Sequence, residues 1–307
     1  MKYLKRFCPV GLVLCVVLVL AGCASYPRAP KSKLSSYDPE CFMDHETVQV
    51  PMSHDGTRQW RVNAEVDGVP GVFVVDTGAD FTVITPQFAQ RLAATDGAGG
   101  DRLISRKFRG ARVDFAKITR FQLGGAAYAG FYAPVINLDH INRAMHTEVA
   151  GILGNNLLNK TAYEADWNRD VLTLESRSSE SPAGAIPISI RNNRVYLQVR
   201  INGRAAEFAL DTGAYRSTLA QPEVARLKIP AEKQTDIDAP RIDVNGAERL
   251  KQTQAELDTF EAGPIRRANY QIITWEHNAL GMDLLAPWVL KVDARRGWMA
   301  LEMTHAQ

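Results

Sequence analysis

An internal repeat constrains the fold of this chain more than any other feature of its sequence. An apolar run followed by Asp-Thr-Gly-Ala occurs at 76–79 and again at 211–214, an offset of 135 residues (211 minus 76). Before each copy, an Asp-Gly pair at Asp67 or an Asn-Gly pair at Asn202 separates two apolar runs, which is typical of a β-hairpin. After each copy an apolar-Leu-Gly segment recurs. The repeat therefore predicts two similar domains in one chain.

Both copies predict mainly β structure. Short apolar runs broken by Gly and Asn-Gly turns favour strands, and the few helical patterns are too short for a parallel βαβ sheet. We therefore expect two similar lobes, at 46–175 and 186–307. A stretch rich in Ser, Pro and Arg, at 176–185, is expected to join them.

The N-terminus has the residue order of a secretory signal, because basic residues precede an apolar run and then small residues. The apolar run, Val10 to Leu20, is shorter than the roughly 20 residues of a membrane-spanning helix. It ends in Leu-Ala-Gly-Cys, which resembles a bacterial lipobox and implies removal of 1–22 and acylation of Cys23. An ordinary cleaved signal is the alternative. Residues 23–45 would then hold the fold at the membrane as a lipidated tether.

This resemblance implies a location in the bacterial cell envelope, facing the periplasm. Ala24 follows the lipobox Cys, where an Asp would retain the protein at the inner membrane, so the outer membrane is favoured. Loss of Cys8 and Cys15 with the signal, and acylation of Cys23, leave Cys41 without a disulfide partner. We expect a structural role for Cys41.

Composition excludes several classes of function. The 36 basic and 34 acidic residues give a net charge of +2 without a basic stripe, so a nucleic-acid partner is not expected. The six His form no His-Glu-x-x-His motif and no close set with Cys, so neither a metal site nor a cofactor is predicted. The Gly-x-Ser-x-Gly motif of serine hydrolases is also missing from the sequence.

The repeated aspartates, Asp76 and Asp211, suit the hydrolysis of a peptide bond. Two carboxyl groups about 3 Å apart cannot both ionise, so such a pair shares one proton and supplies a base and an acid together. The Thr that follows each Asp can anchor its loop through a hydroxyl, and the Gly allows two such loops to approach closely. A lone Asp-Thr-Gly usually marks a turn, whereas two with matched flanking segments are specific.

The segment Val74–Ile84 resembles the active-site segment of retroviral-type aspartic proteases. The segment Gly151–Leu158 resembles the second conserved segment of that family. The resemblance implies two retropepsin-like β-barrel lobes, fused into a pepsin-like pseudo-dimer with a central cleft. It makes Asp76 and Asp211 the catalytic pair. It also assigns the following residues to the active-site loops: Thr77, Gly78, Ala79, Thr212, Gly213 and Ala214.

Substrate contacts are implied by the same resemblance. Hairpin flaps are expected near 96–100 and 243–246 on turn chemistry, although either could be a plain surface hairpin. The expected contacts are Asp80, Tyr215, Gly99, Gly100, Asn245 and Gly246. Asp80 matches an Asp that retroviral enzymes pair with an Arg directly after the Gly of the second segment. In this chain Asn155 stands at the position of that Arg, which puts the ion pair in doubt. Tyr215 replaces Asp80 in lobe two, so an asymmetric cleft and a monomer with an internal pseudo-dimer are expected.

The sequence thus predicts an aspartic endopeptidase that acts on proteins or peptides in the envelope. Pepsin-like enzymes usually carry a hydroxyl residue where Ala79 and Ala214 stand, and that hydroxyl would lower the pKa of the carboxyl. We therefore expect activity at mildly acid to near-neutral pH. A peptide-binding lipoprotein of the same fold without catalysis is the alternative, and trimming of the chain's own tether is a third possibility.

Overall fold

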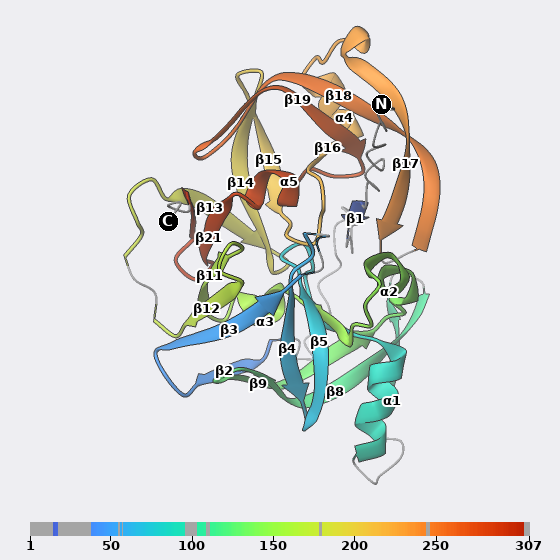
Figure 1. The fold of residues 1–307 in the computed structure, drawn as a ribbon, viewed down its shortest axis with the longest axis vertical. Coiled ribbons are helices and arrows are strands. Elements are labelled where there is room, and N and C mark those ends of the chain that lie inside the picture. Colours follow the sequence, from blue (N-terminus) through green and yellow to red (C-terminus); the bar gives the residue numbers. More distant parts are fainter. Residues whose placement is uncertain are drawn as a thin grey trace, which may run out of the picture.

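The computed structural model describes residues 15–17, 38–54, 56, 58–95, 103–108, 111–177, 180–243 and 246–303 (Figure 1). Most of the predicted signal and tether, including Cys23, lies outside these residues. Cys15–Val17 forms a short strand, β1. Among the described residues, no helix is long and apolar enough to cross a bilayer.

Lobe one consists mainly of strands. Its elements are β2 (Glu40–Met43), β3 (Thr47–Ser53), β4 (Arg61–Val66), β5 (Val69–Val75), β6 (Val83–Ile84), α1 (Pro86–Thr95), β7 (Leu103–Phe108), β8 (Ala111–Leu123), β9 (Ala126–Val135), α2 (Asp139–Met145), β10 (Gly151–Leu153), α3 (Asn155–Leu158), β11 (Ala162–Asp166) and β12 (Val171–Glu175).

Lobe two repeats this order, except that α2 has no counterpart among its described residues and a 3₁₀ helix follows its first α-helix. Its elements are β13 (Ile186–Arg191), β14 (Arg194–Ile201), β15 (Arg204–Leu210), β16 (Thr218–Ala220), α4 (Gln221–Arg226), the 3₁₀ helix η1 (Ala231–Lys233), β17 (Gln234–Asp243), β18 (Gly246–Ala262), β19 (Ile265–Trp275), β20 (Ala279–Leu280), α5 (Met282–Leu285), β21 (Trp288–Asp293) and β22 (Trp298–Met303). The prediction of a mainly β, two-lobed pseudo-dimer is confirmed.

The hairpin that leads to each Asp-Thr-Gly forms where the repeat predicts it. In lobe one, β4 and β5 pair with Val66 opposite Val69, and Asp67 at the turn has φ 47°. In lobe two, Asn202 at the turn between β14 and β15 has φ 49°. Asp, Asn and Gly tolerate this left-handed region better than other residues, which explains the Asp-Gly and Asn-Gly pairs.

A six-stranded sheet joins the two lobes, in the order β3, β12, β11, β21, β22, β13. In Figure 1 lobe one lies below and lobe two above, and the joining strands lie between them. At the centre of the sheet Glu164 of β11 is opposite Lys291 of β21. These two residues occupy equivalent positions in the repeat, so the pseudo-two-fold axis passes between them. The Lys291 Nζ lies 3.3 Å from Glu164 Oε2.

Each lobe carries a long hairpin after its first helix. In lobe two, β17 and β18 pair up to Asp243 opposite Gly246, so the flap predicted at 243–246 coincides with a hairpin turn. The flap predicted for lobe one, at 96–100, lies outside the described residues. The hairpin that corresponds to β17–β18 lies further along the chain, where Phe108 of β7 is opposite Ala111 of β8.

Candidate active site

Asp76 and Asp211 lie at the ends of buried strands, β5 and β15, and are themselves buried. A strand from the Leu-Gly segment of each lobe runs parallel to this strand, β10 beside β5 and β20 beside β15. The Asp76 N–H donates to Leu153 O at 3.1 Å, and the Asp211 N–H donates to Leu280 O at 3.0 Å. The two repeated motifs of each lobe therefore meet, and the Leu-Gly segment supports the Asp-Thr-Gly loop through this backbone hydrogen bond.

The two loops interlock through their threonines. The Thr77 N–H donates to Thr212 Oγ1 and the Thr212 N–H donates to Thr77 Oγ1, both at 3.0 Å. The Thr77 hydroxyl in turn donates to Leu210 O at 3.1 Å, and the Thr212 hydroxyl donates to Val75 O at 3.0 Å. Four symmetric bonds thus cross between the lobes and fix the aspartates on either side of them.

The glycine of each loop lies against the carboxyl group of the other lobe. A Cβ added at Gly78 would lie 2.4 Å from Asp211 Cγ, and one added at Gly213 would lie 2.4 Å from Asp76 Cγ. Real Cβ atoms essentially never approach this closely. Glycine is therefore required at both positions, and the contact brings the two carboxyl groups together across the pseudo-axis.

Burial changes the acidity of the pair. It raises the pKa of Asp211 to about 6, although Arg194 and the backbone N–H groups of Ala214 and Gly213 oppose the rise. Burial and the neighbouring Asp211 charge raise the pKa of Asp76 well above its usual range. Because like charges this close cannot both be stable in a buried site, loss of the second proton is opposed, and the pair shares one proton above the pH at which the first is lost.

Asp80 forms an ion pair after all, but with an arginine from lobe two. Asn155 is not its partner, because the Asn155 Nδ2 donates to Thr77 O at 2.5 Å. Instead, Arg194 Nη2 of β14 lies 3.0 Å from Asp80 Oδ1, and both side chains are buried. Asn193 Nδ2 also donates to Asp80 O at 3.2 Å. The ion pair therefore crosses between the lobes.

The repeat places Gln59 at the position that corresponds to Arg194. Gln59 is fully buried, and its Nε2 donates to Gly213 O of the lobe-two loop at 2.7 Å. Next to it, the Arg58 guanidinium lies 5.4 Å from the centre of the Tyr215 ring. Each lobe thus braces the other lobe's loop, with a cation in one case and a neutral amide in the other. Both side chains lie two residues before a matched pair of the repeat, Arg61 and Tyr196, so extending the repeat toward the N-terminus would have found them.

The other residues that the sequence predicted for the site are not all close to the two aspartates. Ala79 and Ala214 are buried beside the pair, and Gly246 begins β18. Gly99, Gly100 and Asn245 lie outside the described residues. Cys41 is half-buried, and burial raises the pKa of its thiol, which disfavours a nucleophilic role. Within the described ranges, no group of three or more His, Cys, Asp or Glu side chains could hold a metal ion.

Comparison with known proteins assigns each lobe separately. The family model described as aspartyl protease matches residues 62–157, and the one described as gag-polyprotein putative aspartyl protease matches residues 197–286. No curated protein matches the chain. Each match contains one Asp-Thr-Gly and one Leu-Gly segment. The chain therefore belongs to the retropepsin-like aspartyl proteases, with two lobes of this family in one polypeptide.

Proposed function

We propose that this chain is an aspartic endopeptidase of the bacterial envelope that hydrolyses peptide bonds through Asp76 and Asp211. The observation that carries the proposal is the pair of buried carboxyl groups, each held against the glycine of the other lobe's loop. A fold that only binds peptide has no need of two adjacent carboxyl groups with raised pKa values.

The one proton that the pair shares supplies both roles of the reaction. Ionised Asp211 takes a proton from water, whose oxygen attacks the carbonyl carbon, while protonated Asp76 gives its proton to the carbonyl oxygen. When the C–N bond of the tetrahedral intermediate breaks, Asp211 gives its proton to the leaving nitrogen. Asp76 takes a proton back from a hydroxyl of the intermediate, and the pair returns to its starting state.

The edge of β17 supports the binding of an extended peptide. Cys15–Val17 runs parallel to 241–243 of β17, next to the turn of the β17–β18 hairpin. A substrate in extended conformation would add to the same edge through backbone hydrogen bonds. Cleavage after Gly22 would remove β1, so the mature chain would leave this edge free for substrate.

The rate is expected to follow a bell-shaped pH profile with its maximum at mildly acid to near-neutral pH. Raising the pH through the pKa of Asp211, about 6, ionises the base and increases the rate. Raising it further removes the one proton that the pair shares, so the acid is lost and the rate falls. Cleavage of an unfolded protein, followed by mass spectrometry from about pH 3 to about pH 8, tests both the activity and the profile. Binding without any cleavage in this range would favour the non-catalytic alternative, and activity confined to pH below about 3 would contradict the profile.

Lipidation is expected at Cys23. Replacing Cys23 with Ser should abolish incorporation of labelled palmitate and release the protein from the membrane fraction, because Cys23 is the cysteine of the lipobox-like segment that ends the apolar run. Cys41→Ser is the matched control and should keep both label and membrane association. Labelling of the Cys23→Ser variant at the parent level would show that the lipobox assignment is wrong.

A further inference from the structure

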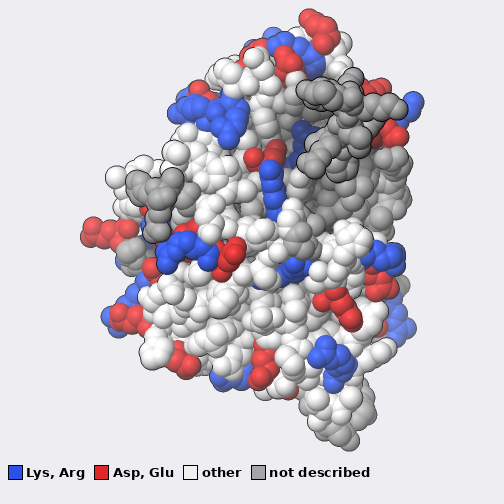
Figure 2. Space-filling view, in the orientation of Figure 1, with Lys and Arg blue, Asp and Glu red and all other residues white. Residues whose placement is uncertain are grey.

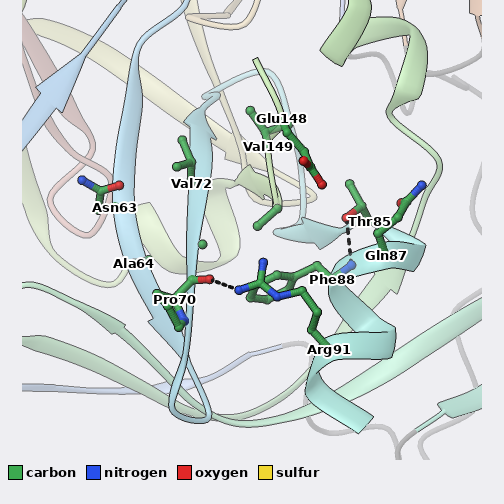
Figure 3. A pocket seen from close by; sticks show the side chains of 12 residues that line it. Asn63, Ala64, Pro70, Val72, Thr85, Gln87, Phe88, Arg91, Glu148 and Val149 are labelled. Carbon is green, nitrogen blue, oxygen red and sulfur yellow. Dashed lines mark hydrogen bonds between the residues drawn. The ribbon is translucent and has the colours of Figure 1, made fainter. Parts of the chain in front are cut away.

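A groove with a volume of about 370 Å³ opens on the flank of lobe one, between the β4–β5 hairpin, α1 and the segment before β10 (Figure 3). Its floor is mainly apolar and is formed by Ala64, Gly71, Val72, Phe88, Val149 and Ala150. Gly71 allows β5 to lie close to Ala150 and Phe88, because an added Cβ would lie 2.6 Å from Ala150 Cβ and 2.8 Å from Phe88 Cε2. The volume lies at the low end of the range for sites that bind small ligands.

An arginine with spare hydrogen-bond donors lies at the rim of this groove. Arg91 of α1 is exposed, and its Nη2 donates to Pro70 O at 2.8 Å. Its guanidinium lies 5.2 Å from the centre of the Phe88 ring, over the apolar floor (Figure 3). A guanidinium has five N–H donors in a geometry that matches a carboxylate. No carboxylate of the described residues forms an ion pair with Arg91.

The equivalent arginine of lobe two forms an ion pair with a carboxylate. Arg226 corresponds to Arg91, and its Nη2 donates to Ala205 O at 2.8 Å, just as Arg91 does to Pro70 O. Arg226 also binds the Glu223 carboxylate through two bonds, of 2.7 and 2.5 Å.

Lobe one lacks this carboxylate. Phe88 stands in lobe one where Glu223 stands in lobe two, and Val72 stands where Glu207 stands. Glu207 is an acid that pairs with Arg191. Both positions are acidic in lobe two and apolar in lobe one, and both apolar residues line the groove. Lobe one therefore has the arginine without the carboxylate partner that it has in lobe two, beside an apolar floor.

We propose that this groove binds the C-terminal residue of a peptide chain. An apolar side chain at that residue fills the floor, and the α-carboxylate occupies the place on Arg91 that the Glu223 carboxylate occupies on Arg226. The rim residue Asn63 carries an amide group that matches a peptide backbone, whereas the Gln87 amide donates to Asp139 Oδ1 at 3.2 Å. Glu148, also on the rim, disfavours a second acid, so the ligand carries one carboxylate near its end. The site does not depend on catalysis by the aspartates.

Fluorescence anisotropy with a labelled tetrapeptide that ends in Leu tests the proposal. The full chain carries Asp211→Asn to prevent cleavage. The free acid is expected to bind roughly tenfold or more tightly than the C-terminal amide, because one charge-assisted pair is lost in the amide. Arg91→Gln should remove this preference. Arg226→Gln, the matched change in lobe two, should retain it. A peptide ending in Ser should bind weakly because it leaves the floor empty.

A second variant tests the site in case Arg91→Gln misfolds, and a carrier protein shows whether the ligand is the end of an intact protein or a free peptide. Val72→Glu, which copies Glu207 of lobe two, places a carboxylate in the floor and should also abolish binding. The same four residues at the C-terminus of a folded carrier protein should bind if protein ends are recognised, whereas binding of the free peptide alone identifies cleavage products. Equal binding of acid and amide, an unchanged preference in Arg91→Gln, or no binding of the acid at about 1 mM would overturn the proposal.

Discussion

Replacing Asp211 with Asn is expected to lower kcat/KM for a peptide substrate by about 10⁴-fold or more. Asn cannot take a proton from water, so the base is lost. The fold should persist, because the amide has nearly the same shape and its oxygen can still accept the Ala214 N–H, which bonds Asp211 Oδ1 at 2.9 Å. Initial rates with a fluorogenic peptide at the optimal pH measure the effect, and circular dichroism shows that the variant is folded.

A loss of similar size is expected for Asp76→Asn, because one carboxyl group cannot supply the base and the acid of the same step. Asp258→Asn is the control, since it removes an exposed carboxyl of β18 that pairs with Lys233. It should leave the rate unchanged. If either dyad variant kept more than about a tenth of the parent rate, the assignment of the catalytic pair would be wrong.

Replacing Arg194 with Gln is expected to lower the free energy of unfolding by about 3–5 kcal/mol. The change leaves the Asp80 carboxylate buried without its cation, and a buried charge that loses its opposite charge is strongly destabilising. The shape of Gln is compatible with this kind of position, since Gln59 occupies the equivalent place in lobe one. Urea denaturation measures the loss, and adding Asp80→Asn to the variant should recover most of it.

The same substitution is expected to move the acid limb of the rate profile to higher pH. Arg194 lowers the pKa of Asp211 and of Asp76, so its removal raises the pH at which the base ionises. Adding Asp80→Asn should not reverse this shift, because the positive charge is still missing. Arg200→Gln, an exposed change on the same strand, is the control for both measurements. A variant as stable as the parent, with an unchanged acid limb, would contradict this role for Arg194.

Local patterns predicted the parts of the site that depend on neighbours in sequence. Asp67 and Asn202 adopt the left-handed conformation that the hairpin turns require. The apolar runs before Asp76 and Asp211 form buried strands, which bury the two aspartates. The cross-lobe ion pair was not predicted, because Asp80 and Arg194 are 114 positions apart and only the closed pseudo-dimer brings them together. The lobe-one hairpin was also missed, because the residues between Phe108 and Ala111 lack the Asn-Gly signature of a tight turn.

The contact between Glu164 and Lys291 has a consequence for how the two halves can pair. In a dimer of identical lobes, the residue on the two-fold axis meets its own copy, so an acid would face an acid and a lysine would face a lysine. A fused chain is free of that restriction, and here the two halves have diverged into opposite charges on the axis. If the halves were produced as separate polypeptides, each would prefer the other over a second copy of itself. The Glu164–Lys291 ion pair therefore favours pairing of lobe one with lobe two over pairing of either lobe with its own copy.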